Sequence, residues 1–199
     1  MKQICLYIRI LLSLALFAFI ALSCSSGDLK KSDEEPEKTD TTSDSENLIE
    51  SKWFPEGLAP VMIDGKWGFI DKTGKITINP QFDLARSFSE GLAPVKIDGK
   101  WGFIDKTGQF VINPQFVGSC DFSEGLAIVY VVKGGTLKFG FIDKTGQYVI
   151  NPQFDFAFDF SEGLAPVKIA EKWGFIDKTG QFVINPQFDG IDLLSILSP

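Results

Sequence analysis

The sequence predicts an all-β protein built from four tandem repeats of about 34 residues, each folded as a three-stranded β-meander. The segment "KWGFIDKTG" begins at Lys66 and returns at Lys100 and Lys172, and a variant, "KFGFIDKTG", begins at Lys138. The aromatic second residues of these segments lie 34, 38 and 34 positions apart. Recurring Asp-Gly, Thr-Gly and Asn-Pro pairs, and the absence of a 3.6-residue apolar period, favour strands and turns over helices.

The first two strands of each repeat are predicted to form a hairpin. In the first copy, two strand-like runs flank Asp64-Gly65, and a two-residue Asp-Gly loop favours a type I′ turn. This turn places Met62 opposite Trp67 and Val61 opposite Gly68. A glycine that faces a branched side chain is expected to let a neighbouring layer approach closely.

The third and fourth copies vary the hairpin tip. The third copy carries four extra residues with Gly134-Gly135 at its tip, and two extra residues per strand put Tyr130 opposite Phe139. An even insertion keeps each side chain on its own face, which supports the hairpin register. The fourth copy has Ala170-Glu171 at its tip, so the type of this turn is left open.

The rest of each repeat is a turn, a strand and a link. "DKTG" is predicted to form a type I turn followed by a left-handed glycine. The returning strand, such as "KITIN", is expected to end at Asn79-Pro80, because proline cannot donate to the ladder. Phenylalanines such as Phe82 and Phe88 are expected to pack one repeat on the next. A propeller-like body and an open stack of meanders are both compatible with these features.

Two sets of recurring carboxylates invite a glycosidase interpretation. Catalysis by a pair of carboxylates needs unequal surroundings, with one acid and one base, whereas a fourfold repeat gives every copy the same surroundings. The aspartates are therefore predicted to cap the "DKTG" turns, and the glutamates are predicted to lie at surface bends. The members of the two sets are Asp71, Asp105, Asp143 and Asp177, and Glu56, Glu90, Glu124 and Glu162.

The large aromatic residues of the hairpins are the candidate binding residues. They are Trp67, Trp101, Trp173, Tyr130 and Phe139. A row of such rings would suit a sugar or an exposed peptide. The alternative is ordinary packing, since each tryptophan faces a long side chain across its hairpin, and a lysine stem can lie across an indole.

The repeated text "EGLAPVKIDGKWGFIDKTGQFVINPQFD" resembles the WG-containing repeat family, also called KWG repeats. The resemblance covers Glu56 to Asp189 in four copies, and the third copy departs from the pattern at Phe139. It implies a bacterial protein, often exported, with many copies in tandem. It implies no general activity and no set of catalytic residues.

The N-terminus is predicted to be a helical lipoprotein signal peptide at residues 1–23. Lys2 and Arg9 precede an apolar run of 13 residues, Ile10 to Leu22, which is short for a membrane span and typical of a signal peptide. A retained transmembrane anchor is the alternative. The segment "ALSC", which ends at Cys24, resembles the lipobox of bacterial lipoproteins. That resemblance implies acylation of Cys24, for example with palmitate, and Ser25 then favours the outer membrane.

Three further segments follow. Residues 24–50 are predicted to hold the lipidated cysteine and a disordered acidic tether, since nine acidic and three basic residues lie between Asp28 and Glu50 and no aromatic residue is present. Residues 51–189 are predicted to form the β domain of four repeats. Residues 190–199 are either an apolar cap or the mark of a truncation. After removal of Cys5 and acylation of Cys24, Cys120 would have no intrachain disulfide partner, and it is expected to be a core or loop residue.

The composition excludes several classes of function. The chain has no histidine, which excludes Ser-His-Asp and Cys-His chemistry, and residues 51–199 are nearly neutral, with 17 acidic and 14 basic residues, so no nucleic-acid partner is expected. No cofactor or metal is expected. We predict a non-enzymatic binding module at the bacterial cell envelope, held on membrane lipid through acylated Cys24 and recognising a protein or a glycan.

Two alternatives stay open. One is a glycan-acting or other hydrolytic enzyme, whose site should break the symmetry between copies; the long hairpin from Ile128 to Phe139, near Cys120, is the place where it would lie. The other is a structural envelope protein, or a truncated fragment, without a specific ligand.

Overall fold

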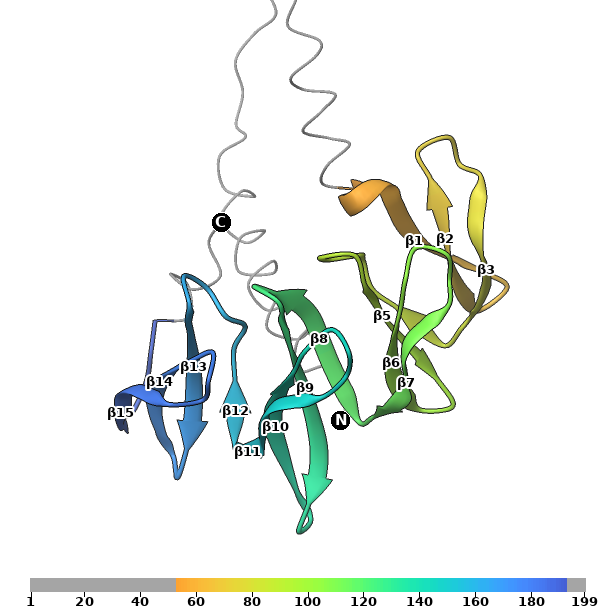
Figure 1. The fold of residues 1–199 in the computed structure, drawn as a ribbon. Helices are drawn as coiled ribbons and strands as arrows, with labels where there is room; N and C mark the ends of the chain where they lie inside the picture. Colours follow the sequence, from red (N-terminus) through yellow and green to blue (C-terminus); the bar gives the residue numbers. More distant parts are fainter. Residues whose placement is uncertain (1–52, 193–199) are drawn as a thin grey trace, which may run out of the picture. The chain divides into compact units, whose positions relative to one another are not determined.

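The computed structural model describes residues 53–192 (Figure 1). The predicted signal peptide, Cys24, the tether and residues 193–199 of the tail lie outside this range. Strands and turns fill the chain from Leu58 to Phe188. The elements are η1 (Pro55–Gly57), β1 (Leu58–Ile63), β2 (Lys66–Asp71), β3 (Ile76–Phe82), β4 (Leu84–Ala85), β5 (Ala93–Ile97), β6 (Lys100–Ile104), β7 (Phe110–Phe116), β8 (Gly118–Ser123), β9 (Leu126–Lys133), β10 (Thr136–Ile142), β11 (Tyr148–Phe154), β12 (Phe156–Ala157), β13 (Leu164–Ile169), β14 (Lys172–Asp177) and β15 (Phe182–Phe188).

Each repeat forms one antiparallel sheet, which confirms the predicted fold class of tandem β-meanders. In the described part of the chain, repeat 1 is the sheet β1-β2-β3, repeat 2 is β4-β5-β6-β7, repeat 3 is β8-β9-β10-β11, and repeat 4 is β12-β13-β14-β15. Repeats 2 to 4 thus have one strand more than predicted. The extra strand comes from the link, which runs beside the next hairpin and pairs Leu84 with Lys96 and Ala85 with Val95. Pairing supplies acceptors for link N–H groups that would otherwise need water.

The predicted hairpin register is confirmed. In repeat 1, Val61 pairs with Gly68 and Met62 pairs with Trp67. Asp64 has φ 51° and Gly65 has φ 77°, as a type I′ turn requires. In this local part of the fold, the turn residues and the alternation of side chains determine which residues meet.

The two variant hairpins keep the same register. Tyr130 pairs with Phe139 in the long hairpin, as predicted. The tip left open in repeat 4 has φ 47° at Ala170 and φ 64° at Glu171, so it adopts the same left-handed geometry without a glycine. Left-handed backbone costs a non-glycine residue about 1–2 kcal/mol. The Asp155 carboxylate, which accepts a hydrogen bond from the Ala170 N–H at 3.0 Å, helps to hold this turn.

The glycine of the "WG" pair has a role that differs from the predicted one. Between β2 and β3 the register shifts, because Trp67 pairs with Phe82 while Phe69 pairs with Ile78. A Cβ atom added to Gly68 would lie 2.5 Å from the Ile78 carbonyl oxygen and 2.7 Å from the Pro80 nitrogen. The close approach that Gly68 permits is therefore made by a bulge of its own sheet and not by a neighbouring layer.

The same bulge corrects the predicted end of the third strand. β3 continues through Asn79-Pro80 to Phe82. The bulge takes Pro80 out of the regular ladder, so its missing N–H group costs no strand hydrogen bond. The equivalent strands β7, β11 and β15 continue through their Asn-Pro pairs in the same way.

The hydrophobic core lies between consecutive repeats. Two clusters of buried residues each draw on two neighbouring sheets, so neither sheet could bury its apolar face alone. The first cluster contains Leu58, Phe69, Ile78 and Phe82 of repeat 1 with Phe88, Ala93, Val95 and Ile104 of repeat 2. The second contains Leu92, Trp101, Phe103, Ile112 and Phe116 of repeat 2 with Phe122, Ala127, Val129 and Ile142 of repeat 3.

We predict that Gly102→Ala destabilises the protein far more than Gly99→Ala. The new methyl group at position 102 would lie 2.5 Å from the Ile112 carbonyl oxygen, and backbone cannot move aside as a side chain can. We expect a loss of about 3 kcal/mol in the free energy of unfolding, at the upper end for overpacking. Gly99 has φ 77° and open space around it, so alanine there should cost about 1 kcal/mol. Urea unfolding compares the two, and equal losses would contradict the bulge contact.

Candidate functional site

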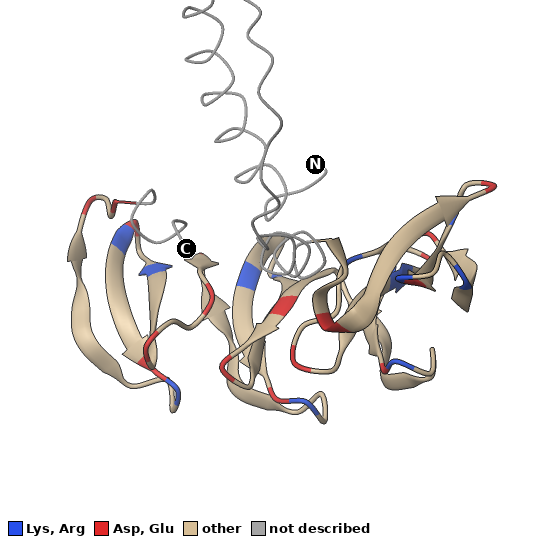
Figure 2. Cartoon of the chain, turned by 90° about the horizontal axis from the view of Figure 1, so that it is seen from above, with Lys and Arg blue, Asp and Glu red and all other residues tan. Residues whose placement is uncertain are grey.

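The charged residues gather mainly at the turns that connect the strands (Figure 2). In the "DKTG" turn of repeat 2, Asp105 Oδ1 accepts hydrogen bonds from the Thr107 N–H at 2.9 Å, the Thr107 hydroxyl at 2.6 Å and the Gln109 N–H at 3.1 Å. The Thr107 hydroxyl is the main cause that lowers the pKa of Asp105. Asp71, Asp143 and Asp177 make the same bonds, which confirms that this set of aspartates caps turns.

The recurring glutamates join consecutive repeats. Glu90 is the first residue of a two-residue turn and has φ 52°, and its carboxylate accepts hydrogen bonds from the Gly125 N–H at 3.0 and 3.2 Å. The Lys144 ammonium lies 3.1 Å from the same carboxylate. Gly125 and Lys144 both belong to repeat 3, so one carboxylate of repeat 2 holds two turns of the next repeat. We call this arrangement the glutamate clamp.

Two further glutamate clamps have partners of the same kind, namely a glycine N–H and a lysine of the next repeat. Glu56 accepts from the Gly91 N–H and pairs with Lys106 at 3.0 Å, and Glu124 accepts from the Gly163 N–H and pairs with Lys178 at 3.1 Å. The hydrogen bond from Lys178 is the main cause that lowers the pKa of Glu124. For Glu56, burial raises the pKa, but the bonds from Gly91 and Lys106 outweigh it and lower the pKa overall. These carboxylates are therefore anions at neutral pH and not proton donors.

The clamps were missed by the sequence analysis, which placed the glutamates at surface bends. A signal was present in the sequence. Both central residues of a type I′ turn need positive φ, and Gly, Asn and Asp are the residues that tolerate it best. A glutamate kept in four copies at such a position points to a task for its carboxylate that offsets the strain of about 1–2 kcal/mol.

The three hairpin tryptophans lie in three different sheets. Trp101 is only 8% exposed, and the Arg86 guanidinium lies 5.2 Å from the centroid of its ring. Trp67 is partly buried against the core of repeats 1 and 2. Trp173 stacks on Phe158 at 5.6 Å. The structure does not bring these candidate binding residues together in one place, and Trp67 and Trp173 remain partly accessible.

Tyr130 and Phe139, the other two candidates, face each other across the long hairpin, with ring centroids 5.0 Å apart. Phe139 is only 2% exposed, whereas Tyr130 is partly accessible. The Tyr130 ring occupies the space above Gly118, where a Cβ atom would lie 1.8 Å from it. Gly118 thus makes room for the one hairpin that differs from the others.

Cys120 lies in β8 and is buried, as expected of a core residue. Cys120 is disulfide-bonded. The sequence analysis expected no disulfide partner for Cys120, on the premise that Cys5 is removed and Cys24 is acylated.

An exposed apolar row recurs on the third strands of the repeats, and the sequence analysis did not single it out. Val111, Val149 and Val183 occupy equivalent positions and are 45%, 42% and 58% exposed. Each follows an aromatic residue that is also partly exposed, namely Phe110, Tyr148 and Phe182. We call these six residues the third-strand row. Its sequence signal is the "QFV" or "QYV" that follows "DKTG" in the second, third and fourth copies.

A protein-family model, described as "WG containing repeat", matches residues 54–67, 67–101, 101–131, 139–173 and 173–194. The chain belongs to the WG containing repeat family. The internal boundaries of the matched ranges fall mostly at the aromatic residue before the bulge glycine, namely Trp67, Trp101, Phe139 and Trp173, and the gap at 132–138 coincides with the long hairpin tip. This WG repeat chain is thus a repeat-containing module, and membership of the family is compatible with a protein that is not an enzyme.

No curated protein matches the chain. Among solved structures, a chain described as the structure of 2S albumin seed protein from Dolichos is similar at 14% identity and a TM-score of 0.28, with 72% of this chain and 95% of that chain covered.

No helix within residues 53–192 has the length and apolar character needed to cross a membrane. The same range contains no group of three or more His, Cys, Asp or Glu residues placed to hold a metal ion.

Proposed function

We propose that this WG repeat protein is an exported, lipid-anchored, non-enzymatic binding module of the bacterial cell envelope. The third-strand row is the observation that supports the binding role most. Apolar residues that stay exposed at the same position of successive repeats form a regular surface, and repeat proteins commonly use such surfaces to hold another macromolecule. A protein or a glycan is the proposed ligand class.

The anchor rests on the N-terminal sequence. A short apolar run behind Lys2 and Arg9 precedes "ALSC", and acylation of Cys24 would place more than one chain in the bilayer. Two or more acyl chains anchor stably, where one chain binds only marginally. The acidic stretch up to Glu50 then acts as a spacer between membrane and repeats, and Ser25 favours the outer membrane.

The glutamates and aspartates support a non-enzymatic role. Three of the recurring glutamates are occupied in the clamps, and the four "DKTG" aspartates each bind the threonine of their own turn. A hydrolase would need two carboxylates with unequal surroundings, one of them able to give up a proton near neutral pH. The caps instead repeat the same surroundings in all four copies, and the clamps do so in three.

We predict that Cys24→Ala abolishes lipid attachment. Cells that express the full chain are labelled with radioactive palmitate, and the wild-type protein is expected to carry label because the Cys24 sulfur is acylated. Cys5→Ala, a cysteine within the predicted signal peptide, is the matched control and should keep full labelling. Undiminished labelling of Cys24→Ala would remove the anchor from the proposal.

We predict that charge in the third-strand row prevents ligand capture. The full chain, solubilised in detergent, is used to capture partners from cell-envelope extracts. The double variant Val111→Glu and Val149→Glu should recover at least about tenfold less partner, because each carboxylate would lose its water shell on contact with an apolar ligand surface.

The control for this capture is Val132→Glu, which changes a valine of the long hairpin that is 58% exposed. It should recover as much partner as the wild type. Equal recovery by the double variant and the wild type would contradict a binding role for the row. A loss seen only with Val132→Glu would move the site to the long hairpin.

A further inference from the structure

The three junctions between consecutive repeats use one set of contacts. A phenylalanine of the "WGF" segment meets a link phenylalanine of the next repeat, an isoleucine of the third strand lies under the next "DKTG" glycine, the last phenylalanine of the third strand meets the next third-strand aromatic ring, and a glutamate clamp closes the junction. Between repeats 2 and 3 these contacts are Phe103–Phe122 at 5.0 Å, Ile112 with Gly146, Phe116–Tyr148 at 6.2 Å, and Glu90 with Gly125 and Lys144.

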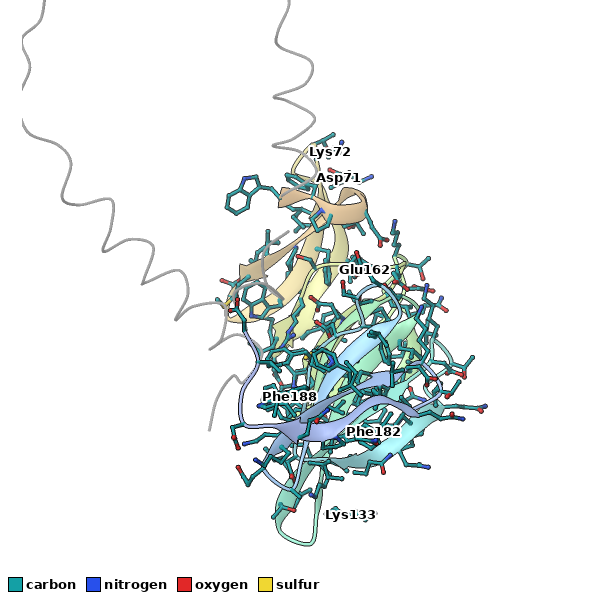
Figure 3. All side chains as sticks on the ribbon, turned by 90° about the vertical axis from the view of Figure 1, so that its left-hand side faces the viewer. Asp71, Lys72, Lys133, Glu162, Phe182 and Phe188 are labelled. Atoms are coloured by element: carbon teal, nitrogen blue, oxygen red, sulfur yellow. The ribbon has the colours of Figure 1, made fainter. Side chains whose placement is uncertain are left out.

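Repeat 4 presents the same face without a following repeat among the described residues. Its equivalent residues are Phe175, Ile184, Phe188 and Glu162, and we call them the trailing face. Phe188 is 42% exposed, whereas its equivalent Phe154 in repeat 3 is 1% exposed. Phe175 and Ile184 are also less buried than their counterparts in repeats 1 to 3. Figure 3 labels Glu162, in the turn before β13, and Phe188, the last residue of β15.

Repeat 1 presents the complementary half of a junction, which we call the leading face. Phe54 aligns with the link phenylalanine Phe88, Gly74 with Gly108, and Ile76 with Phe110. A Cβ atom added to Gly74 would have no neighbour within 4 Å, whereas one added to Gly108 would lie 3.0 Å from Ile78. Ile76 is 43% exposed. The leading face thus carries the kinds of residue that cover Phe, Ile and Phe at the three internal junctions, and the trailing face has no such cover among the described residues.

The polar partners of Glu162 are also present in repeat 1. Gly57 aligns with Gly91, and Lys72 aligns with Lys106, the two partners that Glu56 holds in repeat 2. The Gly57 N–H donates to the Phe54 carbonyl oxygen at 2.8 Å, a local bond that would be exchanged for Glu162. Lys72 already takes part in another interaction, and its ammonium group has three donors.

We propose that the trailing face of one copy of this chain binds the leading face of a second copy, head to tail, through a fourth junction of the same kind. Phe54, Gly74 and Ile76 of the second copy would cover Phe175, Ile184 and Phe188, and its Lys72 would pair with Glu162. Such an interface joins two different surfaces. Each copy can therefore bind one neighbour at its leading face and another at its trailing face, so assemblies can grow.

The chemistry of the trailing face favours a second copy over the chain's own tail. Residues 193–199 read "LLSILSP" and contain neither a cation for Glu162 nor an aromatic ring for Phe175. A carboxylate covered by apolar residues without a donor would be costly, because it would lose its water without gaining a partner. The leading face supplies the cation, the N–H donor and the ring together.

Sedimentation velocity of the full chain in detergent, from about 1 to about 100 μM, tests the proposal. The wild type should form larger species as concentration rises. Glu162→Arg, which alters the trailing face, and Ile76→Glu, which alters the leading face, should each weaken association at least about tenfold by burying a mismatched charge. An equimolar mixture of the two variants should form dimers and nothing larger, because each variant keeps one intact face.

Asp98→Arg is the matched control for Glu162→Arg. Asp98 also occupies a left-handed turn position, with φ 49°, it lies at an internal hairpin tip, and the substitution makes the same change of charge. It should associate like the wild type, and circular dichroism should show that all variants are folded.

Three results would overturn the proposal. The first is a wild-type chain that keeps a single mass over the whole concentration range, and the second is a mixture of the two variants that forms no dimer. The third is a chain shortened after Asp192 that associates where the full chain does not, since the tail would then be the occupant of the trailing face.

Discussion

Burial of one sheet's aromatic face against the next sheet is the interaction on which the rest of this structure depends. Each WG repeat is a small sheet, and the phenylalanine after its glycine packs on a link phenylalanine of the following repeat, as Phe69 does on Phe88 and Phe141 does on Phe160. A three-stranded or four-stranded sheet of this size is marginal alone, so the stability of the domain resides in its junctions. The hairpins, bulges and turns serve to present these faces in the same orientation four times.

The glutamate clamp adds a polar and directional contact to each junction. A glutamate in left-handed backbone is strained, and the strain is retained where the carboxylate gains an N–H donor and a lysine of the next repeat. Aromatic contacts alone would allow one sheet to slide along the next. The Glu90 carboxylate must reach both Gly125 and Lys144, and this requirement fixes the offset between the two sheets. The same pairing of an apolar face with a charged clamp is what makes the two terminal repeats complementary to each other.

The local features of this fold could be predicted from the sequence, whereas the contacts between strands and repeats that lie further apart in the chain could not. The partners Val61 and Gly68 follow from a two-residue turn and a period of two, both of which lie within ten residues of chain. The bulge that gives Gly68 its close contact, and the path of β3 through Pro80, depend on how a third strand settles against the second. The clamp joins Glu90 to Gly125 over 35 positions, so its only signal in the sequence was the recurrence of glutamate at an unfavourable turn position.

The most direct test of the junctions compares Glu90→Gln with Glu162→Gln by urea unfolding at low protein concentration. The two glutamates share the same turn and nearly the same φ, of 52° and 53°, and differ in that Glu90 holds a following repeat. We expect Glu90→Gln to lower the free energy of unfolding by about 1–2 kcal/mol, through loss of charge-assisted bonds. Glu162→Gln should stay within about 0.5 kcal/mol of the wild type. Equal effects of the two substitutions would contradict the view that the junctions stabilise the fold.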